Sequence, residues 1–122
     1  MDESPQPRAA EVESLTDEIA IVTVRGEHDV GTKSELEDAL ARAGLRRHVL
    51  VDLSHCDFMD STVLAVLLSA HRTQAERGGH LELVIPTGAH PIERIATLTG
   101  IRAIVTTHPT RDTGLSSITN TP

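Results

Sequence analysis

Three adjacent polar residues, Asp60, Ser61 and Thr62, stand directly before the apolar run VLAVLLSA. Aspartate and serine are favoured at helix N-caps because their side-chain oxygens accept hydrogen bonds from unpaired backbone N–H groups of the first turn. A hydroxyl there also lies at the positive end of the helix dipole, which stabilises a phosphate of about −1.5 to −2 charge. The residues therefore allow two interpretations: a plain helix cap, or a phosphorylation site whose added charge rejects a partner.

The helix predicted to follow, over residues 61–79, has two faces. At about 100° per residue, one face is expected to pack on a sheet, and it consists of Leu64, Leu67, Leu68, His71 and Ala75. The opposite face consists of Thr62, Val66, Ser69 and Thr73, with Val63 and Ala70 flanking it. Val66 would then be an apolar residue that points outward, with the aliphatic residues Val63 and Ala70 beside it. They are either scattered surface aliphatics or a shallow docking patch for another protein.

Alternating strands and helices are expected to position this helix. Strands are predicted at residues 19–26, 48–54, 80–86 and 101–107, with a weaker candidate at 11–16. Helices are predicted after Thr32, which would form a capping box with Glu35, and at residues 90–100. The alternation predicts a single small α/β domain over residues 10–107, with a mostly parallel or mixed sheet of about four or five strands flanked by about three or four helices.

The two ends of the chain lack this pattern. Residues 1–9 are expected to be a flexible lead-in. Residues 108–122 are rich in Thr, Ser and Pro, and we expect a frayed tail with a possible short helix at 115–118.

The composition excludes several function classes. The net charge is −7, from 18 acidic and 11 basic residues, and an acidic surface repels nucleic acid. Phe58 is the only aromatic residue, so stacking platforms for bases are not expected. The longest apolar run is far shorter than the about 20 residues that span a bilayer, and no signal peptide is visible. We therefore expect a cytoplasmic protein that binds neither nucleic acid nor membrane.

Other reactive residue types do not converge on an enzyme site. His55, Cys56 and Asp57 are adjacent, whereas zinc sites draw spaced ligands from two segments. Cys56 is expected to be a small packing residue, and the scattered histidines, including His48, are expected at the surface. Asp52 is interpreted as a structural strand-end residue. We expect no enzyme activity, no metal and no cofactor.

Two segments of this chain resemble a known family. The segment HVLVDLSHCDFMDSTVLAVLLSAHRTQAERGGHLELV resembles the central part of STAS domains, specifically the bacterial anti-sigma factor antagonists. The segment VRGEHDVGTKSELEDAL resembles the earlier strand, acidic turn and helix of that family. The resemblance covers about residues 11–107.

The resemblance implies a phosphorylation switch. In that family the unphosphorylated antagonist binds an anti-sigma factor that is a serine kinase and thereby frees the sigma factor; a serine phosphatase resets it. The matching serine is Ser61, with Thr62 as second choice. Glu27 and Asp29 match the acidic residues near the kinase-binding surface, and Asp60 would border the Ser61 hydroxyl. The kinase would bring its own ATP.

One residue departs from the family pattern and one is unusual. The family commonly has glycine at the position of Val63, so we expect added bulk beside the phosphorylation site. This departure favours an alternative, a STAS scaffold or small-ligand module that is never phosphorylated. His28 separates Glu27 from Asp29 and is expected to be a solvent-exposed spectator.

Overall fold

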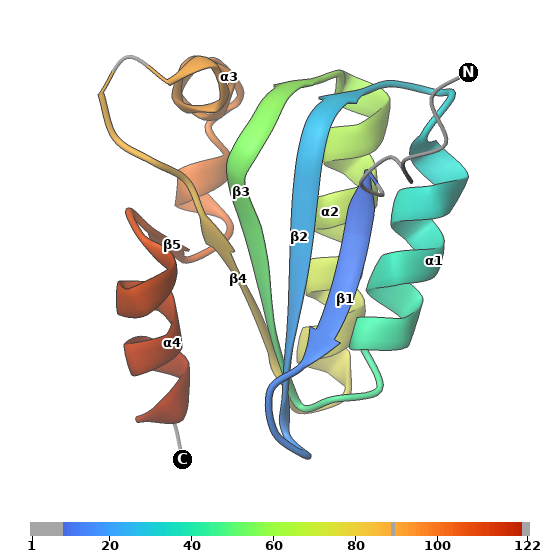
Figure 1. Ribbon diagram of the computed structural model, residues 1–122, viewed down its shortest axis with the longest axis vertical. Helices are drawn as coiled ribbons and strands as arrows, with labels where there is room; N and C mark the ends of the chain where they lie inside the picture. Colours follow the sequence, from blue (N-terminus) through green and yellow to red (C-terminus); the bar gives the residue numbers. More distant parts are fainter. Residues whose placement is uncertain (1–8, 89, 121–122) are drawn as a thin grey trace, which may run out of the picture.

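A single mixed sheet forms the centre of the protein (Figure 1). The computed structural model describes residues 9–88 and 90–120, so the predicted lead-in lies almost wholly outside the described residues. Within them, five strands are ordered β1-β2-β3-β4-β5. Their bounds are Ala10–Ser14, Ile19–His28, His48–Met59, His80–Val84 and Thr107–His108. β1 pairs antiparallel with β2, and the later pairs are parallel.

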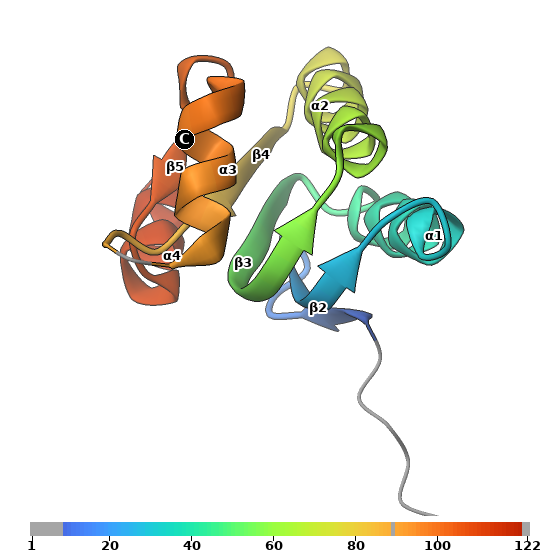
Figure 2. The ribbon, with the colours of Figure 1, turned by 90° about the horizontal axis from the view of Figure 1, so that it is seen from above.

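Helices cover both faces of the sheet (Figure 2). The described helices are α1 (Lys33–Ala43), α2 (Ser61–Glu76), α3 (Pro91–Thr99), the 3-10 helix η1 (Ile101–Ala103) and α4 (Arg111–Thr119). Seen from above, α1 and α2 lie side by side along one face, and α4 lies against the other. This arrangement confirms the predicted α/β class with a mixed sheet.

The core follows the alternation of side chains along β2 and β3. Val22 and Val51 point into the larger apolar cluster, which α1, α2 and α3 cover. Ile21 and Leu50 point the other way, into a smaller cluster closed by Ile118 of α4. Both strands are therefore nearly continuous in apolar residues because both of their faces are buried.

The prediction of a strand at residues 101–107 was wrong for most of its length. Residues 101–103 form η1 instead, and only Thr107 of this stretch enters a strand. Gly100 adopts a φ of 69° at the end of α3, a left-handed conformation that glycine tolerates. The backbone N–H of Val105 then bonds the carbonyl of Ile101 at 3.0 Å. Both residues are buried, so the apolar pattern reported burial and not strand structure.

β2 and β3 are longer than predicted. Residues 55–59, beyond the predicted end of the strand, continue β3 and pair with residues 25–28 of β2, with register shifts between Thr23 and Arg25 and between Gly26 and Glu27. Gly26 allows this irregular pairing through its φ of 76°. The extension carries both strands to a common end, with His28 opposite Met59.

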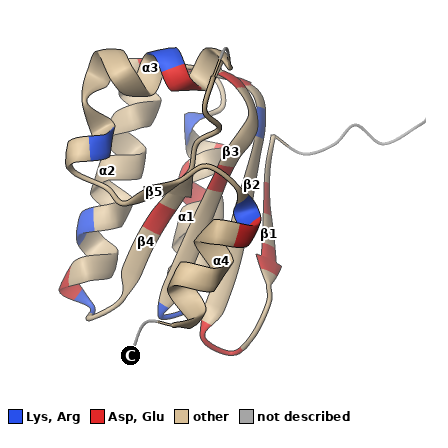
Figure 3. Ribbon diagram, turned by 90° about the vertical axis from the view of Figure 1, so that its left-hand side faces the viewer, with Lys and Arg blue, Asp and Glu red and all other residues tan. Residues whose placement is uncertain are grey.

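The segment after residue 107 is a docked helix and not a frayed tail, and α4 lies against the sheet (Figure 3). Arg111, at the start of α4, donates from Nε to Oδ2 of Asp52 at 2.9 Å and from an Nη atom to the Thr23 hydroxyl at 2.9 Å. His108 bonds Glu82 of β4 at 2.5 Å. Gly114 lies against Leu50, where a Cβ would approach a methyl group to 2.9 Å. Polar contacts and a close helix approach therefore fix α4 on the sheet.

His48 was predicted to lie at the surface because it starts a strand, but the structure buries it. Its side chain is 3% exposed and stacks on the ring of His80, with 5.2 Å between ring centroids. The two residues are register partners in β3 and β4, so the sheet itself brings the rings together. Burial, and then the positive charge of His80 and Arg47, lowers the pKa of His48.

Candidate functional site

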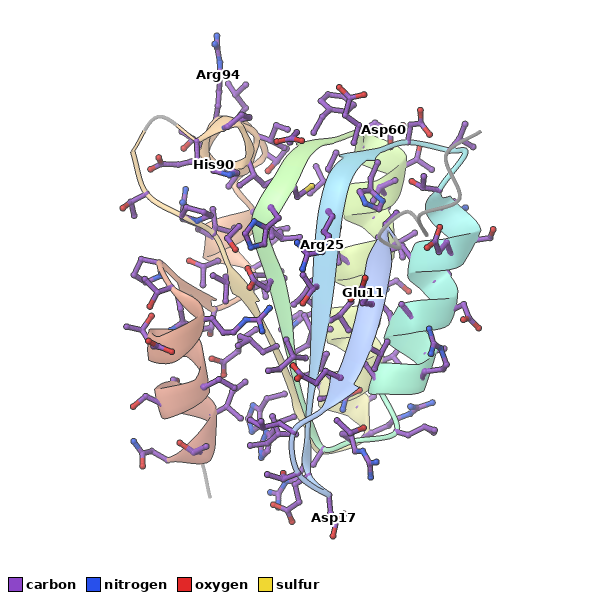
Figure 4. The ribbon with its side chains drawn as sticks, in the orientation of Figure 1. Glu11, Asp17, Arg25, Asp60, His90 and Arg94 are labelled. Atoms are coloured by element: carbon purple, nitrogen blue, oxygen red, sulfur yellow. The ribbon has the colours of Figure 1, made fainter. Side chains whose placement is uncertain are left out.

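The carboxyl ends of β2 and β3 position the predicted site. Because these strands are parallel neighbours, the loops that follow them begin at the same edge of the sheet. The backbone N–H of Asp60 donates to the carbonyl oxygen of His28 at 3.1 Å. The segment carrying Asp29 and the segment carrying Ser61 are therefore joined directly, and Asp60 marks this edge in Figure 4.

Asp60 is the N-cap of α2. Its Oδ1 accepts a hydrogen bond from the backbone N–H of Val63 at 3.0 Å, with an extended backbone at φ −81° and ψ 173°. Ser61 is the first residue of the helix, and both Ser61 and Thr62 are exposed. Since Asp60 caps the helix, the Ser61 hydroxyl is not used for that purpose and lies at the positive helix end in contact with solvent.

The acidic residues Glu27 and Asp29 lie at the same edge. Both side chains are exposed, and Glu27 is opposite Phe58 in the β2–β3 pairing. Oδ1 of Asp29 accepts a hydrogen bond from the backbone N–H of Gly31 at 2.8 Å, which fixes the turn before α1. The structure thus brings Glu27, Asp29 and Asp60 to the edge where Ser61 is exposed.

His28 is a buried structural residue, which corrects its expected exposure. Its ring is 0% exposed. Nε2 donates to the carbonyl of Arg25 at 2.9 Å, and Nδ1 accepts from the hydroxyl of Thr32 at 3.0 Å. Thr32 therefore bonds His28 and not Glu35, and the predicted capping box does not form, since α1 has no side-chain cap bond. His28 connects the end of β2 to the start of α1.

Val63 points into the core, which corrects its predicted place on the partner surface. Its side chain is 0% exposed. The buried face of α2 consists of Val63, Leu64, Leu67 and Gln74. Gln74 is buried because its amide donates to the carbonyl of Arg47 at 3.1 Å, whereas Ala75, predicted to face the sheet, is exposed. The helix is rotated toward Val63 relative to the prediction because α2 packs on α1 as well as on the sheet.

Val66 lines a groove between α1 and α2. The groove has a volume of about 510 Å³, and we refer to it as the α1–α2 groove. Thr62 and Lys33 line its first end, next to the first turns of α1 and α2. Arg77 and Leu45 line its far end, next to the last turns of these helices. The predicted outward face of α2 contributes most of one wall, namely Thr62, Val66, Ser69 and Thr73.

Two exposed apolar residues near the site were not predicted to contact a partner. Val30 is 74% exposed in the turn after Asp29, and Phe58 is 46% exposed three residues before Ser61. Each lies beside an acidic residue in the sequence, Asp29 and Asp57. For Val30 the available signal was a large apolar residue within a polar turn, which offers no strand or helix face to bury it. Phe58 lies in β3 and is exposed because its side chain alternates with that of the buried Met59.

Asp52 is part of the support for the sheet and not of the site. Burial would raise its pKa, but hydrogen bonds from the hydroxyl and backbone of Ser54, together with the Arg111 guanidinium, lower it overall. Burial raises the pKa of the Cys56 thiol to about 11, so this buried cysteine stays protonated and is a packing residue. Residues 9–88 and 90–120 contain no group of three His, Cys, Asp or Glu side chains able to hold a metal ion.

Comparison with known proteins identifies the family. The model of the STAS domain family matches residues 11–114. The chain belongs to the STAS domain family. Its fold is similar to that of an anti-sigma factor antagonist from Mycobacterium paratuberculosis, with 26% identity and a TM-score of 0.78 over 91% of this chain and 93% of that chain.

Further solved structures share the fold. The unphosphorylated anti-sigma factor antagonist SpoIIAA matches with 16% identity and a TM-score of 0.73, over 93% of this chain and 100% of that chain. The phosphorylated form of SpoIIAA from Bacillus matches with 18% identity and a TM-score of 0.68, over 90% and 99%. In the part of this STAS domain that the structure describes, no helix is long and apolar enough to cross a membrane.

Proposed function

We propose that this STAS domain is an anti-sigma factor antagonist. Its unphosphorylated form binds an anti-sigma factor that is a serine kinase, and this binding releases the sigma factor. Phosphorylation of Ser61 by the same kinase, which brings its own ATP, ends the interaction, and a serine phosphatase restores it. The observation that carries the proposal is the exposure of Ser61 at the start of α2, directly after a cap formed by Asp60.

Electrostatics supports a switch at this position. A phosphate on Ser61 would lie at the N-terminus of α2, which the helix dipole stabilises, so the fold tolerates the modification. The same phosphate would add negative charge to an edge that already carries the exposed side chains of Glu27 and Asp29. A partner that matches the unmodified edge is then repelled.

The alternative of a STAS module that is never phosphorylated rested on Val63. A valine side chain beside Ser61 was expected to obstruct a kinase, but this side chain is 0% exposed and points into the core. Nothing else in the described residues favours that alternative over a phosphorylated antagonist. The predicted departure from the family pattern therefore leaves the surface around Ser61 unobstructed.

The direct test is phosphate transfer. The wild type, Ser61→Ala and Thr62→Ala are each incubated with the purified serine-kinase anti-sigma factors of the source organism, labelled ATP and Mg²⁺. We expect label in the wild type and in Thr62→Ala, and none in Ser61→Ala. Intact mass should show one added phosphate. Equal labelling of Ser61→Ala and wild type would contradict the assignment of Ser61.

Binding gives the second measurement. Ser61→Asp should bind the kinase at least tenfold more weakly than wild type while keeping the same thermal unfolding midpoint, because the charge lies where the helix accepts it. The matched control is Ala75→Asp, which places the same charge on the same helix, at an exposed position near its C-terminal end and outside the α1–α2 groove. If Ser61→Asp loses binding and its thermal unfolding midpoint also falls, the loss comes from unfolding, which argues against a charge switch.

A further inference from the structure

The α1–α2 groove has the shape and position of a docking site for a helix. Its floor is apolar, since Leu40, Val49 and Leu81 contribute to it and are buried. Its rims consist of residues three or four apart on each helix: Lys33, Glu37 and Ala41 on α1, and Thr62, Val66, Ser69 and Thr73 on α2. Because α1 and α2 lie side by side (Figure 2), these rims form two walls along the same direction.

The openness of the groove favours a protein segment over a small molecule. Ala41, Leu45, Ala65, Ser69 and Thr73 all line it and all remain exposed. Small-molecule sites usually enclose most of the ligand surface, and a ligand here would stay open to water along its length. The small side chains of the walls instead allow the backbone of another helix to approach closely, as in other helix-in-groove complexes.

The charges at the groove select the chemistry of the occupant. The protein has a net charge of −7, yet the groove carries a cation at each end, Lys33 beside Thr62 and Arg77 beside Gly44. Glu37 is the single acidic residue among the residues that line it. A helix with an apolar stripe and an acidic residue near each end therefore complements the groove.

The groove is also continuous with the proposed switch. Thr62, which lines its first end, directly follows Ser61. A phosphate on Ser61 would bring negative charge next to the end where Lys33 is placed to bind an acidic residue of the incoming helix. That phosphate would compete for Lys33 and repel the acidic residue.

We propose that the α1–α2 groove binds an amphipathic helix of the anti-sigma factor, with acidic residues at its ends facing Lys33 and Arg77. The bound helix of the partner would run along the whole of α2, whose 16 residues are about 24 Å long. Phosphorylation of Ser61 then acts by rejecting one end of this helix. This inference rests on the proposed function, since it takes the partner to be the anti-sigma factor.

The test compares one substitution at two places on the same helix. Ala65 and Ala75 are both exposed on α2, but only Ala65 lines the groove. We expect Ala65→Arg to weaken binding of the purified anti-sigma kinase at least tenfold and Ala75→Arg to leave it within twofold. Ala41→Arg, on the α1 wall, should behave like Ala65→Arg, and circular dichroism checks that each variant is folded.

A second pair tests the charges. Lys33→Gln and Arg72→Gln each remove one cation, and only Lys33 lines the groove. We expect Lys33→Gln to weaken binding severalfold and to reduce the salt dependence of the dissociation constant, and Arg72→Gln to do neither. A photo-crosslinker at Ser69 should label partner residues spaced three or four apart.

The outcomes separate the two proposals. If Ser61→Asp abolishes kinase binding but Ala65→Arg and Ala41→Arg bind normally, the groove inference is wrong and the proposed function stands. If the crosslinked residues of the partner are not spaced as on a helix, the groove inference is also wrong. If no kinase binds wild type, the proposed function fails and the groove inference fails with it. The groove inference would also be wrong if a small molecule saturates the groove and the affinity for the kinase stays unchanged.

Discussion

The backbone N–H of Asp60 and the carbonyl oxygen of His28 are 3.1 Å apart and form a hydrogen bond between the ends of β3 and β2. His28 in turn bonds Thr32 at the start of α1, and Asp60 caps α2. The first turns of both helices are thus held by one short series of contacts. The proposed surface at this edge depends on that series, which makes its members informative to mutate.

Asp60→Ala should destabilise the protein by about 1 kcal/mol, because the backbone N–H of Val63 loses its cap acceptor. Asp60→Asn keeps an acceptor oxygen and should cost only a few tenths of a kcal/mol. Urea denaturation of the three proteins measures the difference. Equal stability of Asp60→Ala and wild type would show that the cap contributes nothing.

His28→Ala should destabilise the protein by about 1–3 kcal/mol, since it leaves the carbonyl of Arg25 without its buried donor and opens space in the core. We also expect faster hydrogen exchange at Gly31 and Thr32, whose turn His28 supports. Amide exchange measured by NMR reports both residues. His55→Ala is a suitable control, because His55 is also a histidine of the sheet but its side chain is exposed.

Arg111→Met should destabilise the protein by about 1–3 kcal/mol and loosen α4, because Asp52 stays buried with one of its partners removed. The lowered pKa of Asp52 adds stability that is present above its unfolded value of about 3.9 and lost as the pH falls further. Arg111→Met should therefore show a smaller loss of stability below about pH 4 than wild type. If the free energy of unfolding falls equally below about pH 4 in both proteins, Arg111 does not lower the pKa of Asp52.

His48 should make stability depend on pH in a higher range. Its folded pKa is lowered, so below the unfolded value of about 6.5 the unfolded chain binds a proton before the folded protein does. The free energy of unfolding then falls as the pH drops from about 6.5 toward the folded pKa. His48→Phe keeps a ring against His80 and removes this titration, so the difference in stability between the two proteins should shrink or reverse on acidification. A constant difference from pH 8 to 5 would contradict the prediction.

Gly79→Ala should destabilise the protein by about 1–3 kcal/mol, because a Cβ there would collide with the carbonyl oxygen of Arg47. Gly78 has a φ of 79° and open space around it, a conformation that asparagine tolerates better than other residues. Gly78→Asn should therefore be clearly milder than Gly79→Ala. Thermal unfolding distinguishes them, and the reverse order would show that backbone conformation outweighs the close contact.

Local signals in the sequence identified most elements and the cap but not the details that depend on tertiary contacts. The end of the helix predicted at residues 90–100 was correct, because glycine commonly ends a helix and Gly100 takes a left-handed φ of 69° there. The helical period of α2 was correct, but the rotation that buries Val63 and Gln74 depends on α1 and the carbonyl of Arg47, 27 residues away. Arg111 was missed because its partner Asp52 is 59 residues away in the chain. His28 gave the same difficulty, since a histidine between two acidic residues carries no local sign of burial.

The opposite directions of Ser61 and Val63 have a mechanical consequence. The two residues belong to one helical turn, and Val63 is fully enclosed while Ser61 is in contact with solvent. Any group attached to the serine oxygen is therefore mounted on a rigid base, and its charge arrives at a defined point without a rearrangement of the turn. A binding protein would then read the modification as a change of potential on an unchanged shape.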